Sequence, residues 1–415
     1  MTASADQTRL PPALIAMLAV VFINMVGFGV VVPLLPFFAR SMNALEWQIT
    51  VMFSAYSLGQ FFAEPFWGRL SDKIGRKKVL VVTVATNVIG YVALAFAPNI
   101  WAAIAIRLFT GLGAGNISTV QGYIADVTPP HQRAARMGLV GAAFGLGFII
   151  GPALGGLLSH PTEGRLGYQL PLFVAAALAA ISAASVQMFV KESRVHAPPP
   201  PPPWRALGQA RAHPVVSRVL LVSLVYMGGF SGMESTFALW AQAKMGWGAR
   251  EVGLCFMVVG IASAVSQAMI TGRLARRFGE ARVLAVGVLT FGGSLILQTL
   301  APVSYLVPVF MAVGAMGMAL AMPNISAMIS HSSPAGQQGS MLGLNMAAGS
   351  GARILGPIVA GFTFTYLGAN WPFWCGAALT VPAAVLAIRA GMALQRWRRE
   401  QLEAAQPRAP APTAA

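Results

Sequence analysis

The chain has 415 residues, of which 56% are hydrophobic and only 10% are charged, and its mean hydropathy is +0.67. Ordinary soluble domains contain about 25% charged residues, so this composition excludes a soluble globular protein. The net charge of +16 would suit a nucleic-acid-binding protein. We assign no nucleic-acid partner, because membrane topology accounts for the basic residues.

Twelve apolar stretches follow one another along the chain. Each could cross a hydrocarbon core about 30 Å thick as a helix of roughly 20 residues. The first is too long for a signal-peptide core and has only Arg9 ahead of it, so we interpret it as a span. We therefore expect an all-α protein with twelve transmembrane helices in a lipid bilayer. The stretches lie near residues 14–38, 48–67, 79–97, 100–124, 134–158, 170–190, 217–241, 251–271, 282–301, 304–328, 338–364 and 372–394.

The basic residues predict the orientation of these spans. With both termini in the cytoplasm, most Lys and Arg fall in cytoplasmic segments, as the positive-inside rule requires. The exceptions are Arg40, Arg165, Lys244 and Arg250 in outer segments, and Arg107 and Arg353 within spans.

A segment with six consecutive prolines and several basic residues divides the chain. We interpret residues 191–214 as a cytoplasmic linker, because a proline run interrupts the apolar pattern. The expected parts are thus an N-terminal six-helix bundle at 1–190, a C-terminal six-helix bundle at 215–394 and a cytoplasmic tail at 395–415.

Two sequence matches indicate that the second bundle is a duplicate of the first. GRLSDKIGRKKVL (68–80) and GRLARRFGEARVL (272–284) are identical at six of thirteen positions. GPALGG (151–156) resembles GPIVAG (356–361) at nearly the same offset. Internal repeats of six spans are typical of secondary transporters, whose substrate path lies between the halves.

In chain order, the first dense charge cluster follows the second span, within residues 68–80. Its lysines are interpreted as topology signals, but an acid such as Asp72 is not needed for that purpose. Glu64 lies eight residues earlier, near the inner face. We expect it either to join the network of Asp72 or to carry protons.

The fourth span contains Arg107, and a charge at this depth must pair or face water. It is therefore a candidate for proton coupling or for the substrate path. The alternative is that it holds helices together through carbonyls or Asn side chains. In the fifth span, GAAFGLGFIIGPALGG (141–156), glycines would allow close packing and Pro152 would bend the helix.

The seventh span contains Glu234, with Trp240 nearby. A proton and a cationic compound could compete for this carboxylate. The alternative is a static ion pair with Arg353 of the eleventh span. Six further polar residues could orient a ligand or form interhelical hydrogen bonds. They are Asn24, Gln60, Asn116, Gln121, Gln267 and Asn345.

Methionines in the tenth span raise the question of a metal site, since thioethers bind soft metals. Such residues are more often deformable apolar packing, so we expect no metal site and no cofactor. Cys255 and Cys375 lie alone in separate spans and are interpreted as buried free thiols. The methionines are Met311, Met316, Met318, Met322 and Met328.

Several of these motifs resemble signatures of the major facilitator superfamily. Residues 68–80 resemble its motif between the second and third spans. RLFTGLGAG (107–115) resembles its fourth-span motif, with Thr110 in place of Gln. Residues 141–156 resemble the fifth-span signature of its drug:proton antiporters. With GFGVVVPLLP (27–36), the resemblance is closest to the tetracycline/proton antiporter group.

The resemblance implies the fold of that superfamily and roles for specific residues. Gly68, Asp72, Arg76 and Asp126 would form a cytoplasmic gate in which Arg76 reaches toward Asp126. Glu234, Asp126, Glu64 and Arg107 would be the proton-coupling candidates. The antiporter motif would comprise Gly147, Gly151, Pro152, Gly155 and Gly156. Substrate would bind among Asn24, Gln60, Asn116, Gln121, Glu234, Trp240, Asn345 and Arg353.

The sequence departs from the tetracycline group where that group has membrane acids. Asn24, Gly90 and Phe291 or Gly292 occupy those neighbourhoods in the first, third and ninth spans. The expected function is therefore that of a monomeric bacterial inner-membrane antiporter, which exports a drug-like or amphipathic small molecule against inward proton flow. The alternative is a proton-coupled transporter of a small metabolite. An ATP-driven pump is disfavoured, since no G-x-x-x-x-G-K-[ST] motif occurs in the sequence. An enzyme is disfavoured because the five histidines are scattered along the chain.

Overall fold

A computed structural model describes residues 12–129, 132–160, 162, 164, 166–193, 208, 213–333 and 338–405. The described chain is helical, and these residues contain no strand. An all-helical fold is the expected solution in a bilayer, because a helix satisfies its own backbone hydrogen bonds.

The helices of the N-terminal half cover the first six expected spans. They are α1 (Pro12–Val31), α2 (Leu35–Arg40), α3 (Glu46–Ile74), α4 (Arg76–Ala95), α5 (Ile100–Leu112), α6 (Asn116–Val127), α7 (Arg133–Leu158), the short η3 (Leu166–Tyr168) and α8 (Gln169–Phe189).

The helices of the C-terminal half cover the other six. They are α10 (Pro214–Met245), α11 (Ala249–Ser266), the π-helical turn η4 (Gln267–Thr271), α12 (Gly272–Phe278), α13 (Glu280–Thr299), α14 (Leu306–Ser332), α15 (Gln338–Leu367) and α16 (Trp371–Ala405).

Nine helices of the described chain are long and apolar enough to cross a membrane. The other three expected spans fall on α3, on α5 with α6, and on α15, all of which are helical. Charges lower the hydropathy of α3, and α5 with α6 is interrupted.

Two spans expected to be continuous are broken. Residues 32–34 separate α1 from α2 at Pro33, which has no N–H to continue the hydrogen-bond ladder. Residues 113–115 separate α5 from α6, and Trp67 Nε1 donates a hydrogen bond to the freed carbonyl of Leu112 at 2.7 Å. Hydropathy alone did not reveal these breaks, because the first depends on a proline and the second on local glycines and a distant hydrogen-bond partner.

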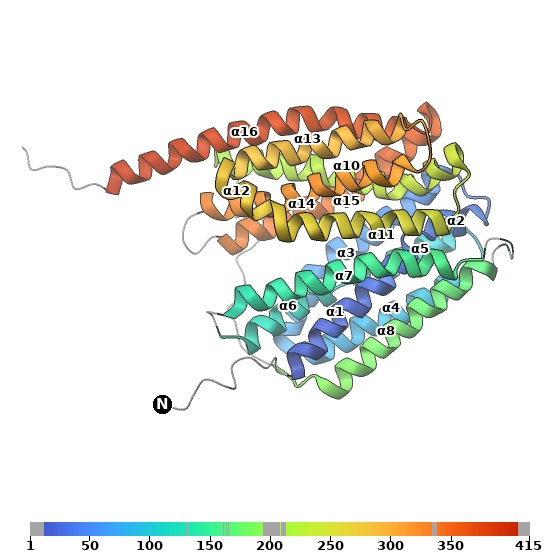
Figure 1. Ribbon diagram of the computed structural model, residues 1–415. Coiled ribbons are helices and arrows are strands. Elements are labelled where there is room, and N and C mark those ends of the chain that lie inside the picture. Colours follow the sequence, from blue (N-terminus) through green and yellow to red (C-terminus); the bar gives the residue numbers. More distant parts are fainter. Residues whose placement is uncertain are drawn as a thin grey trace, which may run out of the picture.

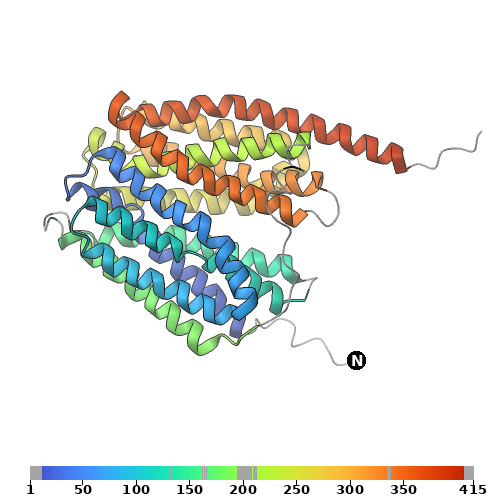
Figure 2. The ribbon, with the colours of Figure 1, turned by 180° about the vertical axis from the view of Figure 1, so that it is seen from behind.

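The helices form two groups that lie one above the other (Figure 1). α1 to α8 pack among themselves, as do α10 to α16, and contacts between the groups run mainly through α3 with α15 and α7 with α11. We call the end of the molecule that carries residues 69–78 and 272–282 the basic end. α6 and α12 lie at this end, and α16 extends beyond the other helices there (Figures 1 and 2).

The halves are joined tightly at the end opposite the basic end. Ser54 Oγ donates a hydrogen bond to the carbonyl of Ile354 at 2.8 Å. The rings of Trp47 and Phe362 stack with their centroids 5.9 Å apart. Gly253 of α11 also packs against the backbone of α7, where a Cβ would collide with the carbonyl of Pro152.

At the basic end the same helices are separate. A cavity of about 810 Å³ opens between α3 and α15. Gly141 and Gly145 of α7 and Gly343 of α15 have no neighbouring atom within 4 Å of where a Cβ would stand. The molecule is therefore closed at one end and open at the basic end.

The expected linker and tail are described only in part. Most of the linker 191–214 and the last ten residues of the tail 395–415 lie outside the described residues. Where the tail was expected to start, α16 continues as a helix to Ala405. Trp397 in this extension contacts the ring of His213, with centroids 5.8 Å apart.

Candidate functional site

The large cavity between α3 and α15 is the main candidate site. Aromatic side chains dominate its α3 wall, and small residues with one methionine form its α15 wall. Phe62 and Phe66 are 63% and 58% exposed, so their rings are available to a ligand. The lining residues are Phe61, Phe62, Glu64, Pro65, Phe66, Arg69, Leu70, Lys73, Gly343, Met346, Ala347 and Ser350.

Glu64 brings a carboxylate into this cavity from α3. Its Oε1 accepts a hydrogen bond from Gln60 Nε2 at 2.8 Å, one turn earlier on the same helix. The predicted residues Gln60 and Glu64 are therefore brought together, with Glu64 half-buried. Glu64 also interacts electrostatically with Arg353 of α15, across the interface of the two halves.

Arg353 approaches the cavity from the opposite wall. Its Nη2 donates a hydrogen bond to the cavity-lining Ser350 at 3.3 Å, while its Nε is buried without a partner. Glu234 of α10 is half-buried and feels the charge of Arg353. However, the described residues contain no ion pair within 4.0 Å between Arg353 and Glu234 or Glu64. The static pair considered from the sequence is therefore not formed in this conformation.

Arg107 of α5 is only 3% exposed and lies 4.3 Å from the ring centroid of Tyr56. Its Nε has no hydrogen-bond partner. The guanidinium is thus held by a cation–π contact rather than by an acid. Tyr56 was missed in the sequence, although Tyr56, Gln60 and Glu64 are spaced by four residues and so share one face of α3.

Two other predicted substrate contacts, Asn24 and Trp240, form hydrogen bonds to other helices or loops of their own half. Asn24 Nδ2 donates to Val20 O at 2.9 Å and to Ser182 Oγ of α8 at 3.3 Å, which is the interhelical alternative. Trp240 is 1% exposed and donates to Asn370 Oδ1 at 2.8 Å, inside the C-terminal half. Neither residue lines the large cavity.

The remaining polar candidates are less constrained. Asn345 Oδ1 on α15 is buried without a hydrogen-bond partner, so it is free to bind a ligand or a neighbouring helix. Gln121 on α6 is half-buried. The side chain of Asn116 lies outside what the structure describes.

The predicted gate residues form a compact charge cluster at the basic end. Arg76 Nη2 lies 2.7 Å from Asp72 Oδ1, and Arg76 Nε lies 3.1 Å from Asp126 Oδ2. Arg76 Nη1 also donates to Ser71 Oγ at 2.8 Å. No neighbouring atom lies within 4 Å of a Cβ built on Gly68, so this side of α3 has room for an approaching helix.

The glycines of the fifth-span motif lie where α7 meets two other helices. A Cβ at Gly147, Gly151 or Gly155 would collide with the backbone of α1, and one at Gly156 would collide with the backbone of α11. Pro152 packs against Gly29 of α1. The motif thus permits backbone contact both within the N-terminal half and across to the C-terminal half.

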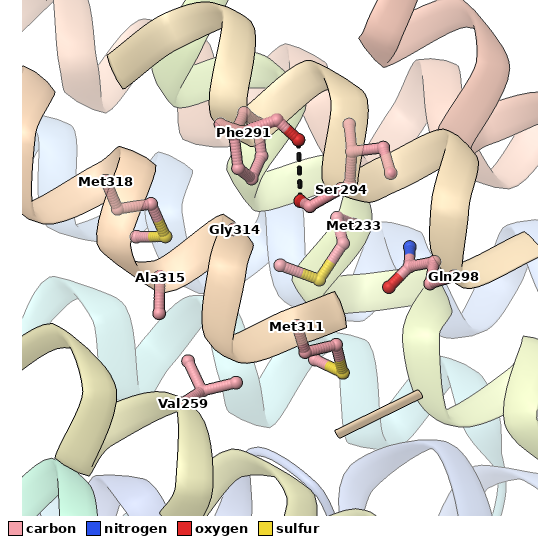
Figure 3. A pocket seen from close by; sticks show the side chains of 10 residues that line it. Met233, Val259, Phe291, Ser294, Gln298, Met311, Gly314, Ala315 and Met318 are labelled. Carbon is pink, nitrogen blue, oxygen red and sulfur yellow. Dashed lines mark hydrogen bonds between the residues drawn. The ribbon is translucent and has the colours of Figure 1, made fainter. Parts of the chain in front are cut away.

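Two of the tenth-span methionines line a small enclosed cavity of about 10 Å³ in the C-terminal half (Figure 3). Met311 and Met318 face it together with Met233, and the Met311 sulfur lies 3.2 Å from Cys255 Sγ. A space of this size holds about one water molecule, so these methionines act here as packing.

Curated relatives match most of the chain. It is 29% identical to the class C tetracycline resistance protein of Escherichia coli, over 90% of this chain and 94% of that protein. It is 26% identical to multidrug resistance protein 2 of Bacillus subtilis (strain 168), over 86% and 90% of the two chains.

A solved structure and a family model also match most of the chain. A bacterial homologue of the human lysosomal transporter Spinster, solved in an inward-facing and occupied conformation, has a TM-score of 0.74 at 15% identity. The likeness covers 97% of this chain and 100% of that one, and it concerns the fold. A model of the Major Facilitator Superfamily matches residues 17–280 and 245–414. The chain therefore belongs to the Major Facilitator Superfamily, whose members are membrane transporters and not enzymes.

Proposed function

We propose that this transporter exports drug-like or amphipathic small molecules in exchange for protons by alternating access. The observation that carries the proposal is the cavity between the two halves, which combines exposed aromatic walls with an intramembrane carboxylate, Glu64. Intramembrane ionisable groups commonly mark substrate or proton pathways. The relatives named as tetracycline and multidrug resistance proteins support an amphipathic, drug-like substrate.

The basic end is assigned to the cytoplasm by the positive-inside rule, which also places both termini there. In a bacterial inner membrane, the open cavity would then face the cytoplasm and receive substrate. The protein works as a monomer in this scheme, because the path lies between the two halves of one chain.

Transport requires that the two halves rock against one another. Residues 1–190 and 215–394 are the proposed moving bodies, and 191–214 is the link between them. Closing the basic end brings α3 toward α15, where Gly68 leaves room for a helix. The cluster of Asp72, Arg76 and Asp126 holds the end of α3 in place for that contact.

Proton coupling is assigned to the acids near the path. Glu234 and Glu64 are half-buried near Arg353, so protonation of either changes the charge balance that a substrate meets. Protonation of Asp126 would weaken its ion pair with Arg76 and so act on the gate. Arg107 places a further buried charge beside Tyr56. One proton moving down a potential of 100 mV releases about 2.3 kcal/mol, enough for modest concentrative export.

The test uses purified protein in proteoliposomes with an imposed pH gradient. Tetracyclines, phenicols, quinolones and lipophilic cations are supplied, and proton movement is followed together with compound accumulation. We expect coupled movement of at least one class and loss of coupling in Glu234→Gln. Absence of coupled movement for every class would overturn export of drug-like compounds and favour a small metabolite as substrate.

A further inference from the structure

We propose that Glu64 and Arg353 form a two-charge subsite that selects zwitterionic amphiphiles, molecules with a cationic and an anionic group on one apolar body. The proposal rests on the proposed function and specifies its substrate class. It concerns the inner end of the cavity between α3 and α15, where the two charges come from different halves of the protein.

The two charges come from the two helices that flank the cavity. Glu64 lines the cavity from α3, and Arg353 is tied by hydrogen bond to Ser350, which lines it from α15. No nitrogen of Arg353 lies within 4.0 Å of a Glu64 oxygen, yet the two charges interact electrostatically. The two charges are thus near enough to interact but are not joined as an ion pair.

Each charge retains unused hydrogen-bonding capacity. Arg353 Nε is buried with no partner, and a buried unsatisfied donor is costly. Gln60 supplies one donor to Glu64, but a carboxylate accepts several hydrogen bonds. A ligand carboxylate at Arg353 and a ligand ammonium at Glu64 would satisfy both groups with charge-assisted hydrogen bonds.

The walls of the cavity fit an apolar body attached to those charges. Phe61, Phe62 and Phe66 lie on α3, and Met346 lies on α15. Glu64 and Lys73, both at the cavity, are nine residues apart on one helix, which corresponds to about 13 Å along the axis. That length accommodates two fused aromatic rings between the subsite and the basic end.

Contact with both halves at once links recognition to transport. A zwitterion bridges Glu64 of the N-terminal half and Arg353 of the C-terminal half, so its binding favours approach of α3 to α15. A ligand with a single charge makes a charged contact to only one half. A ligand shifts a conformational equilibrium only by the difference between its affinities for the two states, here the open and the closed basic end. A zwitterion should therefore favour closure more than a singly charged ligand does.

The test compares three fluorescent probes on one scaffold. Nε-dansyl-lysine carries an α-ammonium and an α-carboxylate, its methyl ester carries only the cation, and its Nα-acetyl derivative carries only the anion. Binding to purified full-length protein is measured by dansyl fluorescence, and movement is measured in proteoliposomes. We expect the zwitterion to bind at least about tenfold more tightly than either single-charge probe, since each charge-assisted contact contributes about that factor.

Two variants assign the preference to the named residues. Arg353→Gln should remove the advantage of the zwitterion over the methyl ester, and Glu64→Gln should remove its advantage over the acetyl derivative. Lys78→Gln loses one exposed cation outside the cavity and should leave both preferences unchanged. Retained preferences in the two cavity variants, in protein that elutes as folded material, would overturn the assignment.

The outcomes also separate this inference from the proposed function. If the three probes bind equally, or if none binds, the two-charge subsite is overturned. Export of the compound panel in the same protein would leave the proposed function standing. Loss of export for the whole panel overturns the proposed function, whatever the probes do.

Discussion

The two halves carry equivalent charge clusters at the basic end, with the signs reversed. In the first cluster Asp72, Arg76 and Asp126 come together. The repeat offset of 204 to 205 residues carries these positions to Arg276, Glu280 and His331, which we call the second cluster. There, His331 Nδ1 lies 3.0 Å from Glu280 Oε1. Glu280 begins α13 and His331 lies near the end of α14, so this pair joins two helices as the pair of Arg76 and Asp126 does.

The reversal makes the two clusters unequal in strength. Arg76 is permanently charged, its side chain is 12% exposed and it contacts two acids. The pair of Glu280 and His331 is fully ionic only when the imidazole is protonated, and the His331 side chain is 47% exposed. Exposed pairs contribute little to stability, so the first cluster is the rigid one and the second is easily broken.

Removing Arg76 should give the largest difference between the clusters. Arg76→Ala leaves Asp126, whose side chain is 15% exposed, and Asp72 without their shared cation. We expect a loss of about 2 kcal/mol in the free energy of unfolding, between the values for exposed and buried pairs. Transport in proteoliposomes should fall to background. Arg76→Lys is the matched control, and it should recover part of the stability because it keeps the charge. Wild-type transport in Arg76→Ala would show that the cluster is only a topology signal.

Asp72→Asn should have the next largest effect on transport. It removes one charge from a side chain that is 33% exposed, so the loss of stability should stay below about 1 kcal/mol. Membrane insertion should be intact, because the basic residues that fix topology remain. Efflux from cells should nevertheless drop several-fold if Asp72 acts in gating. Normal efflux at normal expression would remove Asp72 from the gate.

The glycines before α4 and α13 offer a comparison of backbone positions. Gly75 has φ of 109°, and the carboxylate of Glu192, which accepts a hydrogen bond from Lys77 N at 3.3 Å, packs where a Cβ would stand. Gly279 has φ of 83°, with open space around it. Ala at either position is strained by about 1–3 kcal/mol, because a positive φ combined with ψ of 146° or 150° is almost confined to glycine. Gly75→Ala should lower the unfolding temperature more, because it also displaces Glu192. Equal shifts would show that the Glu192 contact adds no stability.

Sequence reasoning succeeded where the signal is local or repeated. Apolar length located every span on a helix, and the resemblance of residues 68–80 to the superfamily motif indicated the meeting of Arg76 with Asp126. It failed where a contact depends on packing between distant helices. Nothing local to Tyr56 shows that the guanidinium of Arg107 lies on its ring, and the carbonyl that Trp67 satisfies is freed only because α5 ends at Leu112. For the same reason Trp240, with an indole that suits a ligand pocket, lies instead in the core of the C-terminal half.

The smallest expected effect concerns the second cluster. Glu280→Gln removes the acid but keeps a hydrogen-bonding side chain beside His331, whose Nδ1 lies 3.0 Å from Glu280 Oε1. The His331 side chain is 47% exposed, so the variant should lose only a few tenths of a kcal/mol in the free energy of unfolding. The measurement is denaturant unfolding of the purified variant beside wild type and Arg76→Ala under one set of conditions. A loss as large as that of Arg76→Ala would mean that Glu280 acts through a partner other than His331, and the two clusters would then differ in their contacts as well as in sign.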